Sequence, residues 1–243
     1  DAWWDAITVA VTRLMAGGHV PPDDVVAVSV TSQWSGTVPV DAGGRHLHPA
    51  IIWMDARGAQ YVEELVSGPL NVAGYDVRRL RAWIQRTGGI PSHSGKDPIG
   101  HILWLRHERP DVYDQTHAFM EPCDYLNARL TGRQAASYDS IVAHWLTDNR
   151  DLSDVRYDPQ LLEWCGLRES QLPELVPSAS VVGTVLPAVA ESWGLTPATK
   201  VVTATGDVHS AVVGSGALGD LEGHLYMGTS SWLSCHPVSY THL

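Results

Sequence analysis

The sequence predicts an α/β fold in which strands and helices form separate layers. Short apolar runs rich in valine, typical of buried strands, lie near both ends of the chain at residues 25–30 and 201–202. Apolar side chains at helical spacing dominate the residues between them. Strands at both ends with helices between them are the pattern of a layered α/β domain.

Several segments carry apolar side chains at the spacing of an amphipathic helix. They are residues 3–15, 56–66, 77–87, 99–107, 122–130, 161–165 and 187–193. Gly17 and Gly132 follow two of these segments and are expected to end them, because glycine is the usual residue just beyond a helix.

The remaining elements are strands and loops. Residues 37–40 and 50–53 flank a turn at residues 41–44, which predicts a β-hairpin. Residues 137–151, rich in side-chain oxygens, predict a loop with a short apolar element. Residues 219–220 are the best candidate for a domain border, because a new hairpin begins at His224.

Composition excludes several classes of partner. The chain has 243 residues, 44% of them hydrophobic, enough for one large or two small domains with a buried core. Sixteen Lys and Arg against 27 Asp and Glu give a net charge of −11 without a basic cluster, so neither nucleic acid nor a membrane surface is expected to bind. No apolar run approaches the roughly 18 residues that span a bilayer. The sequence carries no signal of the oligomeric state.

Cysteine and histidine usage predicts a cytoplasmic protein without a metal site of its own. Cys123, Cys165 and Cys235 are odd in number and far apart, without CxxC spacing, which favours neither a disulfide framework nor a zinc site. The histidines show no HExxH spacing. The chain starts at Asp1 within a helical pattern, so we expect its N-terminus to be cut.

A carboxylate and a loop of small residues follow two predicted strands near the C-terminus. Asp207 comes directly after residues 201–206, with glycine before it, a setting that holds a general base without crowding. Gly228, Thr229 and Ser230 follow a second apolar strand, and the N–H groups of such a turn bind phosphate oxygens, although these residues also form ordinary turns. Together they predict phosphoryl transfer, with Asp207 accepting the proton of a hydroxyl.

Asp207 also fits two other roles. It can cap the following helix by accepting from the N–H groups of His209 or Ser210. A hydrolase triad of Asp207, His209 and Ser210 is disfavoured, because triad members seldom lie within one helical turn and no GxSxG elbow is present. We expect His209 to pack near the carboxylate or to support it.

Polar and aromatic side chains follow the first predicted strand. Gln33, Trp34 and Ser35 would lie at its carboxyl end, where open α/β sheets bind ligands. Amide and hydroxyl groups suit sugar hydroxyls and an indole suits sugar C–H faces, although a tryptophan here also fits a core. Asp55 and Arg57 are either a surface ion pair or, for Asp55, a further sugar contact.

A series of short motifs runs along the chain in a fixed order. They are SQWSG (32–36), DAGG (41–44), WMDAR (53–57), ILWL (102–105), DYL (124–126) with LTG (130–132), and GD (206–207) with GTS (228–230). In this order they resemble the motifs of the FGGY family of carbohydrate kinases, and most closely those of its xylulokinase-like members. Each motif is weak alone, and their shared order makes the resemblance specific.

The resemblance implies a fold and a domain organisation. The family has two actin-like, or ribonuclease H-like, α/β domains, with sugar and ATP meeting between them. Residues 1–218 would be the N-terminal sugar-binding domain without its first strands, and residues 219–243 the opening hairpin of the nucleotide domain. The chain would thus be truncated at both ends. Residues 238–243 do not continue the family pattern and are expected to be non-native.

The resemblance also implies an activity, the ATP-dependent phosphorylation of a ketose or polyol hydroxyl. Its implied roles are Asp207 as catalytic base, Gln33, Trp34, Ser35 and Asp55 as sugar contacts, and Gly228, Thr229 and Ser230 as phosphate contacts. Mg²⁺ would arrive with ATP. The chain alone is expected to be inactive.

Three departures leave the sugar unidentified. Trp34 and Ser35 replace the usual Met-His of xylulokinases, and Val208 replaces the usual Asn, all of them sugar contacts in that family. A non-catalytic sugar-binding or regulatory homologue is therefore the alternative. Sugar binding without turnover would identify it.

Overall fold

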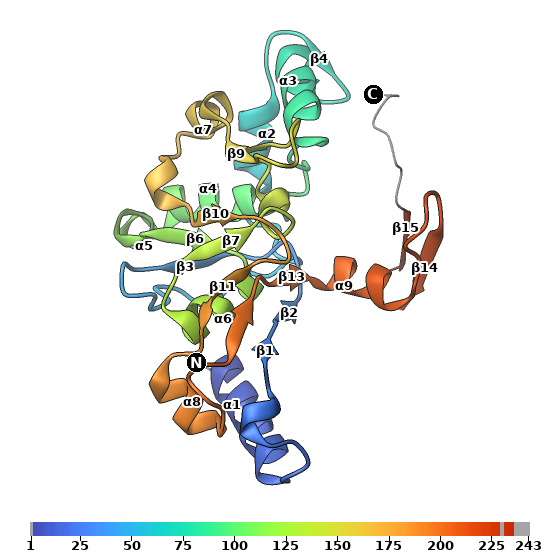
Figure 1. The fold of residues 1–243 in the computed structure, drawn as a ribbon. Helices are drawn as coiled ribbons and strands as arrows, with labels where there is room; N and C mark the ends of the chain where they lie inside the picture. The colour runs from blue at the N-terminus through green and yellow to red at the C-terminus, as the bar shows by residue number, and fades with distance from the viewer. Residues whose placement is uncertain (1, 229–230, 236–243) are drawn as a thin grey trace.

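Strands and helices alternate along the chain in an α/β arrangement, as the sequence predicts (Figure 1). The computed structural model describes residues 2–228 and 231–235. Its helices are α1 (Ala2–Ala16), α2 (Ala59–Val66), α3 (Val77–Thr87), α4 (Pro98–Glu108), α5 (Pro110–Gln115), α6 (Pro122–Thr131), α7 (Pro159–Cys165), α8 (Pro187–Trp193) and α9 (Asp207–Gly214). Short 3-10 turns span Pro22–Asp24, Ile141–His144 and Glu169–Gln171.

The strands are short and most of them pair with distant segments. They are β1 (Ala27–Val28), β2 (Thr31–Ser32), β3 (Val38–Val40), β4 (Asn71–Val72), β5 (Tyr75–Asp76), β6 (Ala118–Met120), β7 (Ala135–Ser137), β8 (Thr147–Asp148), β9 (Arg156–Tyr157), β10 (Glu174–Val176), β11 (Val181–Thr184), β12 (Lys200–Val202), β13 (Thr205–Gly206), β14 (Gly223–Met227) and β15 (Ser231–Cys235). Parallel pairs join β1 with β12, β2 with β13, and β7 with β10. Antiparallel pairs join β11 with β12, and β3 with β6.

Each helix predicted from apolar spacing forms, and local signals set its ends. At the start of α3, the Asp76 carboxylate accepts from the backbone N–H groups of Arg78 and Arg79. Gly88 ends the same helix and Gly132 ends α6, both in the left-handed conformation that glycine adopts without strain. Helix positions were therefore readable from local sequence.

The hairpin predicted at residues 37–53 is wrong in its second strand. Thr37 and Ile51 exchange both backbone hydrogen bonds, at 2.8 and 2.9 Å, but no strand continues from them. The next hydrogen-bonded pair in this register would be Pro39 with Pro49, and neither has an N–H to donate. Strand β3 bonds Leu47 through the Pro39 carbonyl on this edge and pairs with β6 along its other edge, and the sequence distance of β6 hides that pairing from local patterns.

The largest hydrophobic core lies under the helices of the middle of the chain. Its fully buried members include Trp83, Ile102, Phe119, Ile141 and Leu161, from five different segments. Helix α4 lies inside this core, with most of its residues buried.

Three glycines allow the turn before α2, the loop before α4 and α4 itself to touch. A Cβ on Gly95 would lie 2.1 Å from Ala59 N, and one on Gly58 would lie 2.3 Å from Gly100 O. A Cβ on Gly100 would in turn lie 2.5 Å from Gly95 O. Real Cβ atoms do not approach backbone this closely, so larger residues would force these segments apart.

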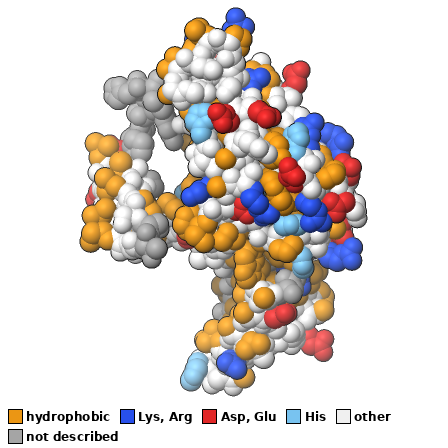
Figure 2. All heavy atoms as spheres, turned by 180° about the vertical axis from the view of Figure 1, so that it is seen from behind, with side chains coloured by type: hydrophobic (Ala, Val, Ile, Leu, Met, Phe, Trp, Pro, Cys, Tyr) orange, Lys and Arg blue, Asp and Glu red, His pale blue; other side chains and the backbone are white. Residues whose placement is uncertain are grey.

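The hairpin of β14 and β15 lies beyond α9, away from the strands of the main body (Figure 1). Seen from behind, it carries mostly hydrophobic side chains, whereas charges of both signs are interspersed over the main body (Figure 2). Leu225, Met227 and Leu233 are among its exposed apolar residues. Within the described ranges, no helix is long and apolar enough to cross a membrane.

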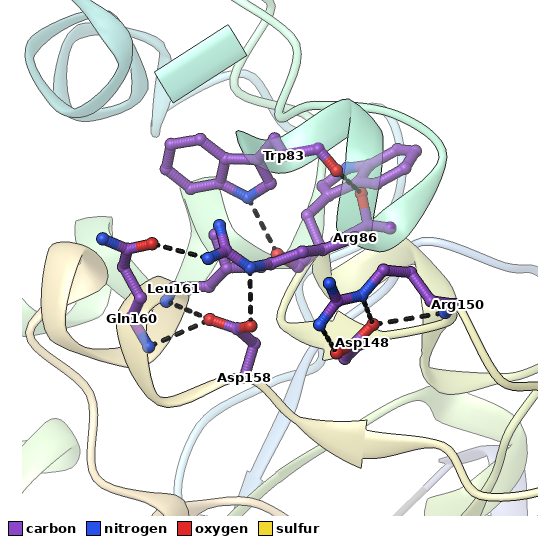
Figure 3. A network of polar contacts seen from close by, with 9 residues as sticks. Trp83, Arg86, Asp148, Arg150, Asp158, Gln160 and Leu161 are labelled. Carbon is purple, nitrogen blue, oxygen red and sulfur yellow. Dashed lines mark hydrogen bonds and ion pairs between the residues drawn. The ribbon is translucent and has the colours of Figure 1, made fainter. Parts of the chain in front are cut away.

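A polar network fastens α3 to α7 and to the turn before β8 (Figure 3). Arg86 on α3 pairs with Asp158 at 2.8 Å, and Asp158 caps α7 by accepting from the N–H groups of Gln160 and Leu161. The Trp83 indole N–H donates to the carbonyl of Trp145 at 2.9 Å. Trp83 and Asp158 are buried within the network, whereas Arg150 and Gln160 lie at its exposed rim.

Candidate active site

The parallel pair of β2 and β13 brings two predicted site segments to one edge. Thr31 lies opposite Thr205 and Ser32 opposite Gly206, so the Gln33 turn and Asp207 leave the two strands at the same level. The hydroxyls of Thr31 and Ser210 are 2.8 Å apart and tie α9 to β2. Residues far apart in sequence thus become neighbours.

Trp34 is fixed on both sides. Its indole N–H donates to the carbonyl of Ser140 at 2.9 Å, and its ring meets the His209 ring edge-on with centroids 4.8 Å apart. A Cβ on Gly206 would lie 2.8 Å from Trp34 Cγ, so the glycine before Asp207 is required for this packing. The expected packing role of His209 is confirmed, and the indole N–H is already engaged within the chain.

The Ser35–Gly36 turn is held by the loop before α4 and by α6. Ser35 has a φ of 62°, uncommon for a residue with a side chain, and its hydroxyl donates to the carbonyl of Lys96 at 3.3 Å. The Gly36 N–H donates to Glu121 Oε2 at 2.9 Å. A Cβ on Gly36 would lie 2.6 Å from Pro122 Cγ, so α6 packs directly against this turn.

Glu121 and Ser140 belong to the surroundings of this site, and our sequence reasoning missed both. Glu121 occupies the N-cap position of α6, where Ser, Thr, Asp or Asn is usual, and its side chain makes no bond to its own helix. That unusual cap is the signal that was available. Ser140 gave none, because it acts through a backbone carbonyl and its position depends on tertiary contacts.

Asp207 is exposed at the first position of α9. Its Oδ1 accepts from the N–H of Val208 at 2.9 Å. The N-cap is Gly206 and carries no side-chain bond, so the alternative in which Asp207 caps the helix through His209 or Ser210 is wrong. A helix that starts at the aspartate itself leaves this carboxylate at the open edge. The Ser210 hydroxyl meets Thr31, which also disfavours the triad.

Asp139 and Asp124 hold the segments around the site through hydrogen bonds. Asp139 accepts from the hydroxyl of Thr205 at 2.7 Å and from Ser178. Burial acts to raise the pKa of Asp139, but the hydrogen bonds that it accepts, led by those from Ser178 and Thr205, together lower the pKa. Asp124 accepts from the Ser140 hydroxyl at 2.7 Å, and its complete burial raises its pKa well above the usual value.

Asp55 forms the ion pair predicted as one of its two alternatives. Both of its carboxylate oxygens accept from the Arg57 guanidinium, whose carbon lies 3.8 Å from the centre of the Trp104 ring. Hydrogen bonds from Arg57 lower the pKa of Asp55. His101 joins this turn to the core, with Nε2 3.3 Å from the Asp55 carbonyl and Nδ1 3.1 Å from the Thr37 hydroxyl. A direct sugar contact of Asp55 stays a prediction.

The predicted phosphate loop is described only at its first residue. Gly228 is exposed and follows β14, whereas Thr229 and Ser230 lie outside the described residues. The ring contacts of the hairpin are internal, with Trp232 against His224 and Tyr226. No three His, Cys, Asp or Glu side chains of residues 2–228 and 231–235 gather as metal ligands would.

Comparison with known proteins assigns this arrangement to a family. Residues 1–214 match the N-terminal domain of the FGGY family of carbohydrate kinases. The chain belongs to the FGGY family. Among FGGY relatives, the xylulose kinase of Escherichia coli strain K12 is 30% identical over 241 residues, which cover 95% of this chain and 44% of that protein. The autoinducer-2 kinase of Photorhabdus laumondii is 27% identical over 215 residues, 88% of this chain and 38% of that protein.

Solved structures show the same fold. The xylulose kinase from Rhodospirillum rubrum superposes with a TM-score of 0.80 at 22% identity, covering 96% of this chain and 45% of that one. The gluconate kinase from Lactobacillus acidophilus gives a TM-score of 0.79 at 19% identity, covering 94% of this chain and 43% of that one. The predicted actin-like α/β fold of the FGGY sugar kinases is therefore confirmed. The chain spans less than half the length of these four relatives, between 38% and 45%.

Proposed function

We propose that the protein carrying this chain is an ATP-dependent kinase that phosphorylates a hydroxyl of a ketose or polyol. The observation that carries the proposal is the β2–β13 pair, which sets the exposed Asp207 beside the turn of Gln33, Trp34 and Ser35. Membership in the FGGY family supports the reaction class. The proposal holds for any oligomeric state.

Asp207 is proposed as the general base. It is exposed, its Oδ1 is oriented by the Val208 N–H, and among the described residues nothing bonds to its Oδ2. A carboxylate so placed can accept the proton of a sugar hydroxyl as that oxygen attacks phosphorus. Since no neighbouring cation pairs with it in the described part of the chain, the carboxylate is available for a substrate hydroxyl.

The sugar contacts are proposed to come from the turn after β2. The Gln33 amide and Ser35 hydroxyl supply hydrogen-bonding groups, and the Trp34 indole supplies an apolar face. The Trp34 N–H already serves Ser140, so its role is packing against sugar C–H groups. Asp55 is proposed as a further contact whose orientation Arg57 fixes.

ATP with Mg²⁺ is the proposed phosphoryl donor, and Gly228, Thr229 and Ser230 are proposed to bind its phosphates. Magnesium neutralises charge on the transferred group when bound. The described residues offer a carboxylate for proton transfer but no group of metal ligands, which fits an ion carried by the nucleotide. We further propose residues 1–218 as the sugar-binding domain and residues 219–243 as the start of the nucleotide domain, with residues 238–243 non-native.

A substrate screen would identify the sugar. Relatives carry names of kinases for xylulose, autoinducer-2 and L-fuculose, so the reaction class is broader than one substrate. The protein carrying this chain would be tested against pentuloses, hexuloses, pentitols and glycerol with a coupled assay for ADP.

We expect sugar-dependent ADP formation with at least one member of the panel, and none from residues 1–243 alone. Sugar binding by calorimetry without ADP formation would identify the protein as a non-catalytic sugar-binding homologue. Turnover by residues 1–243 alone would contradict the proposal that sugar and nucleotide are bound by two separate domains.

A further inference from the structure

The Glu121 side chain is buried and points away from the helix that it precedes. It is fully buried, and its Oε2 accepts from the Gly36 N–H at 2.9 Å rather than from a backbone N–H of α6. Pro122, the next residue, fills the space where Gly36 lacks a Cβ. The start of α6 therefore holds Gly36 in place through one hydrogen bond and one close packing contact.

His144 faces the other oxygen of the same carboxyl. Its Nε2 lies 3.6 Å from Glu121 Oε1, and the ring is fully buried with both nitrogens otherwise unpartnered. Burial lowers the pKa of His144 to about 3, and the nearby His101 adds to this effect. His144 is thus neutral at pH 7, with its Nε2 beside the carboxyl but beyond hydrogen-bond distance.

The charges around Glu121 favour its protonated form. Burial raises the pKa of Glu121 well above its usual value, and the negative charges of Asp124 and Asp207 act in the same direction. The backbone N–H groups of Gly36 and Ser35 lower the pKa of Glu121, but burial is the largest influence and the net shift is upward. A protonated carboxyl keeps one oxygen that accepts, here from Gly36, and carries its proton on the other oxygen, which lies 3.6 Å from His144 Nε2.

The turn held in this way is the one that carries the proposed sugar contacts. Gly36 directly follows Trp34 and Ser35, and Ser35 has the unfavourable φ of 62°. Such a backbone conformation persists only where its surroundings fix it. The Ser140 carbonyl fixes Trp34 and the Lys96 carbonyl fixes the Ser35 hydroxyl, so Glu121 supplies the bond to the backbone itself.

We propose that Glu121, backed by His144, is a positioning residue that presets the Trp34–Gly36 turn for sugar recognition. The recognition of sugar rests on the function proposed above, whereas the grip on Gly36 stands independently of it. Loss of the acceptor would leave a buried N–H without a partner and release the turn. We expect this to weaken sugar binding by about 10-fold to 100-fold.

Two matched substitutions directly test the hydrogen bond from the Gly36 N–H to Glu121. Glu121→Met has a similar length but no acceptor, whereas Glu121→Gln keeps one accepting oxygen and one donating N–H in the shape of the protonated acid. Hydrogen exchange of the segment holding Gly36, followed by mass spectrometry, should become faster in Glu121→Met and stay unchanged in Glu121→Gln. Cys123→Ala, in the same buried turn of α6, controls for general loosening because it removes no bond to Gly36.

Exchange in Glu121→Met that is as slow as in the wild-type protein would overturn the proposal. Exchange that becomes as fast in Glu121→Gln or Cys123→Ala as in Glu121→Met would also overturn it. If Glu121→Met does not fold, infrared spectroscopy decides between the alternatives. The protonated-carboxyl stretch of the wild-type protein at pH 7 should lose intensity in Glu121→Gln, while any contribution from the buried Asp124 stays in both proteins. An identical spectrum from the two proteins would overturn the inference that a protonated Glu121 faces His144.

Sugar binding then separates this inference from the proposed function. With a sugar that the wild-type protein phosphorylates, Glu121→Met should raise KM about 10-fold or more, change kcat much less and leave the KM for ATP unchanged. Glu121→Gln should restore the wild-type KM. Absence of turnover in the wild-type protein would refute the kinase proposal, whereas normal turnover with an unchanged sugar KM in Glu121→Met would refute the role of Glu121.

Discussion

His101 should make the protein less stable as the pH falls from 6.5 toward 4. The ring is 1% exposed and joins the Asp55 turn to Thr37, beside the candidate active site. Burial lowers its pKa from 6.5 to about 4, while the Asp55 carbonyl and carboxylate act against this. The native protein therefore keeps His101 neutral at a pH where the unfolded chain protonates it.

The direction and size of the pH effect on the free energy of unfolding follow from the different pKa of His101 in the native and unfolded states. Below pH 6.5 the unfolded state binds a proton that the native state does not, so stability falls with pH until the native ring also titrates near pH 4. At roughly 1.4 kcal/mol per pKa unit, a shift from 6.5 to about 4 corresponds to about 3 kcal/mol. This loss is the quantity to be measured.

His101→Gln isolates this contribution. Glutamine keeps one donor and one acceptor but does not titrate, and the other ionisable groups are the same in both proteins. Urea unfolding, followed by tryptophan fluorescence between pH 7 and pH 4, gives the free energy of unfolding of each. The difference should shift by about 3 kcal/mol in favour of the variant as the pH falls. A difference that is constant over this range would refute the account of His101.

Two glycine substitutions test the close contacts, each against a glycine with open space around it. Gly206→Ala should lower the free energy of unfolding by about 1 to 3 kcal/mol, because its Cβ would meet Trp34, whereas Gly214→Ala meets nothing within 4 Å and should change it little. Equal melting temperatures of these variants would contradict the packing of Trp34. Gly95→Ala should destabilise by about 3 kcal/mol or more, since it adds a clash with Ala59 to a positive φ, whereas Gly88→Ala has only the positive φ. Similar urea midpoints for this second pair would argue against the three-glycine contact.

Elements with local signals were predictable from the sequence. The helices followed from the spacing of apolar residues, and the ends of α3 and α6 from Asp76, Gly88 and Gly132. The ordered motifs identified the family before any contact was known, and the family model confirms it.

Elements that depend on distant partners were not predictable. The strand expected at residues 50–53 is reduced to a bridge at Ile51, because Pro39 and Pro49 cannot continue the ladder, and the pairing of β3 with β6 left no local signal. The capping alternative for Asp207 failed because α9 starts one residue earlier than a cap would require. Glu121 was missed because its partner, Gly36, lies 85 residues away.

The central claim is that Asp207 accepts a proton from a sugar bound beside Trp34. Asp207→Asn in the protein carrying this chain tests it, with Asp23→Asn, an exposed carboxylate in another part of the fold, as control. The account predicts that Asp207→Asn binds the sugar in calorimetry but forms ADP about 100-fold to 10,000-fold more slowly, while the control matches the wild-type protein. Sugar-dependent ADP formation at the wild-type rate by Asp207→Asn would contradict it.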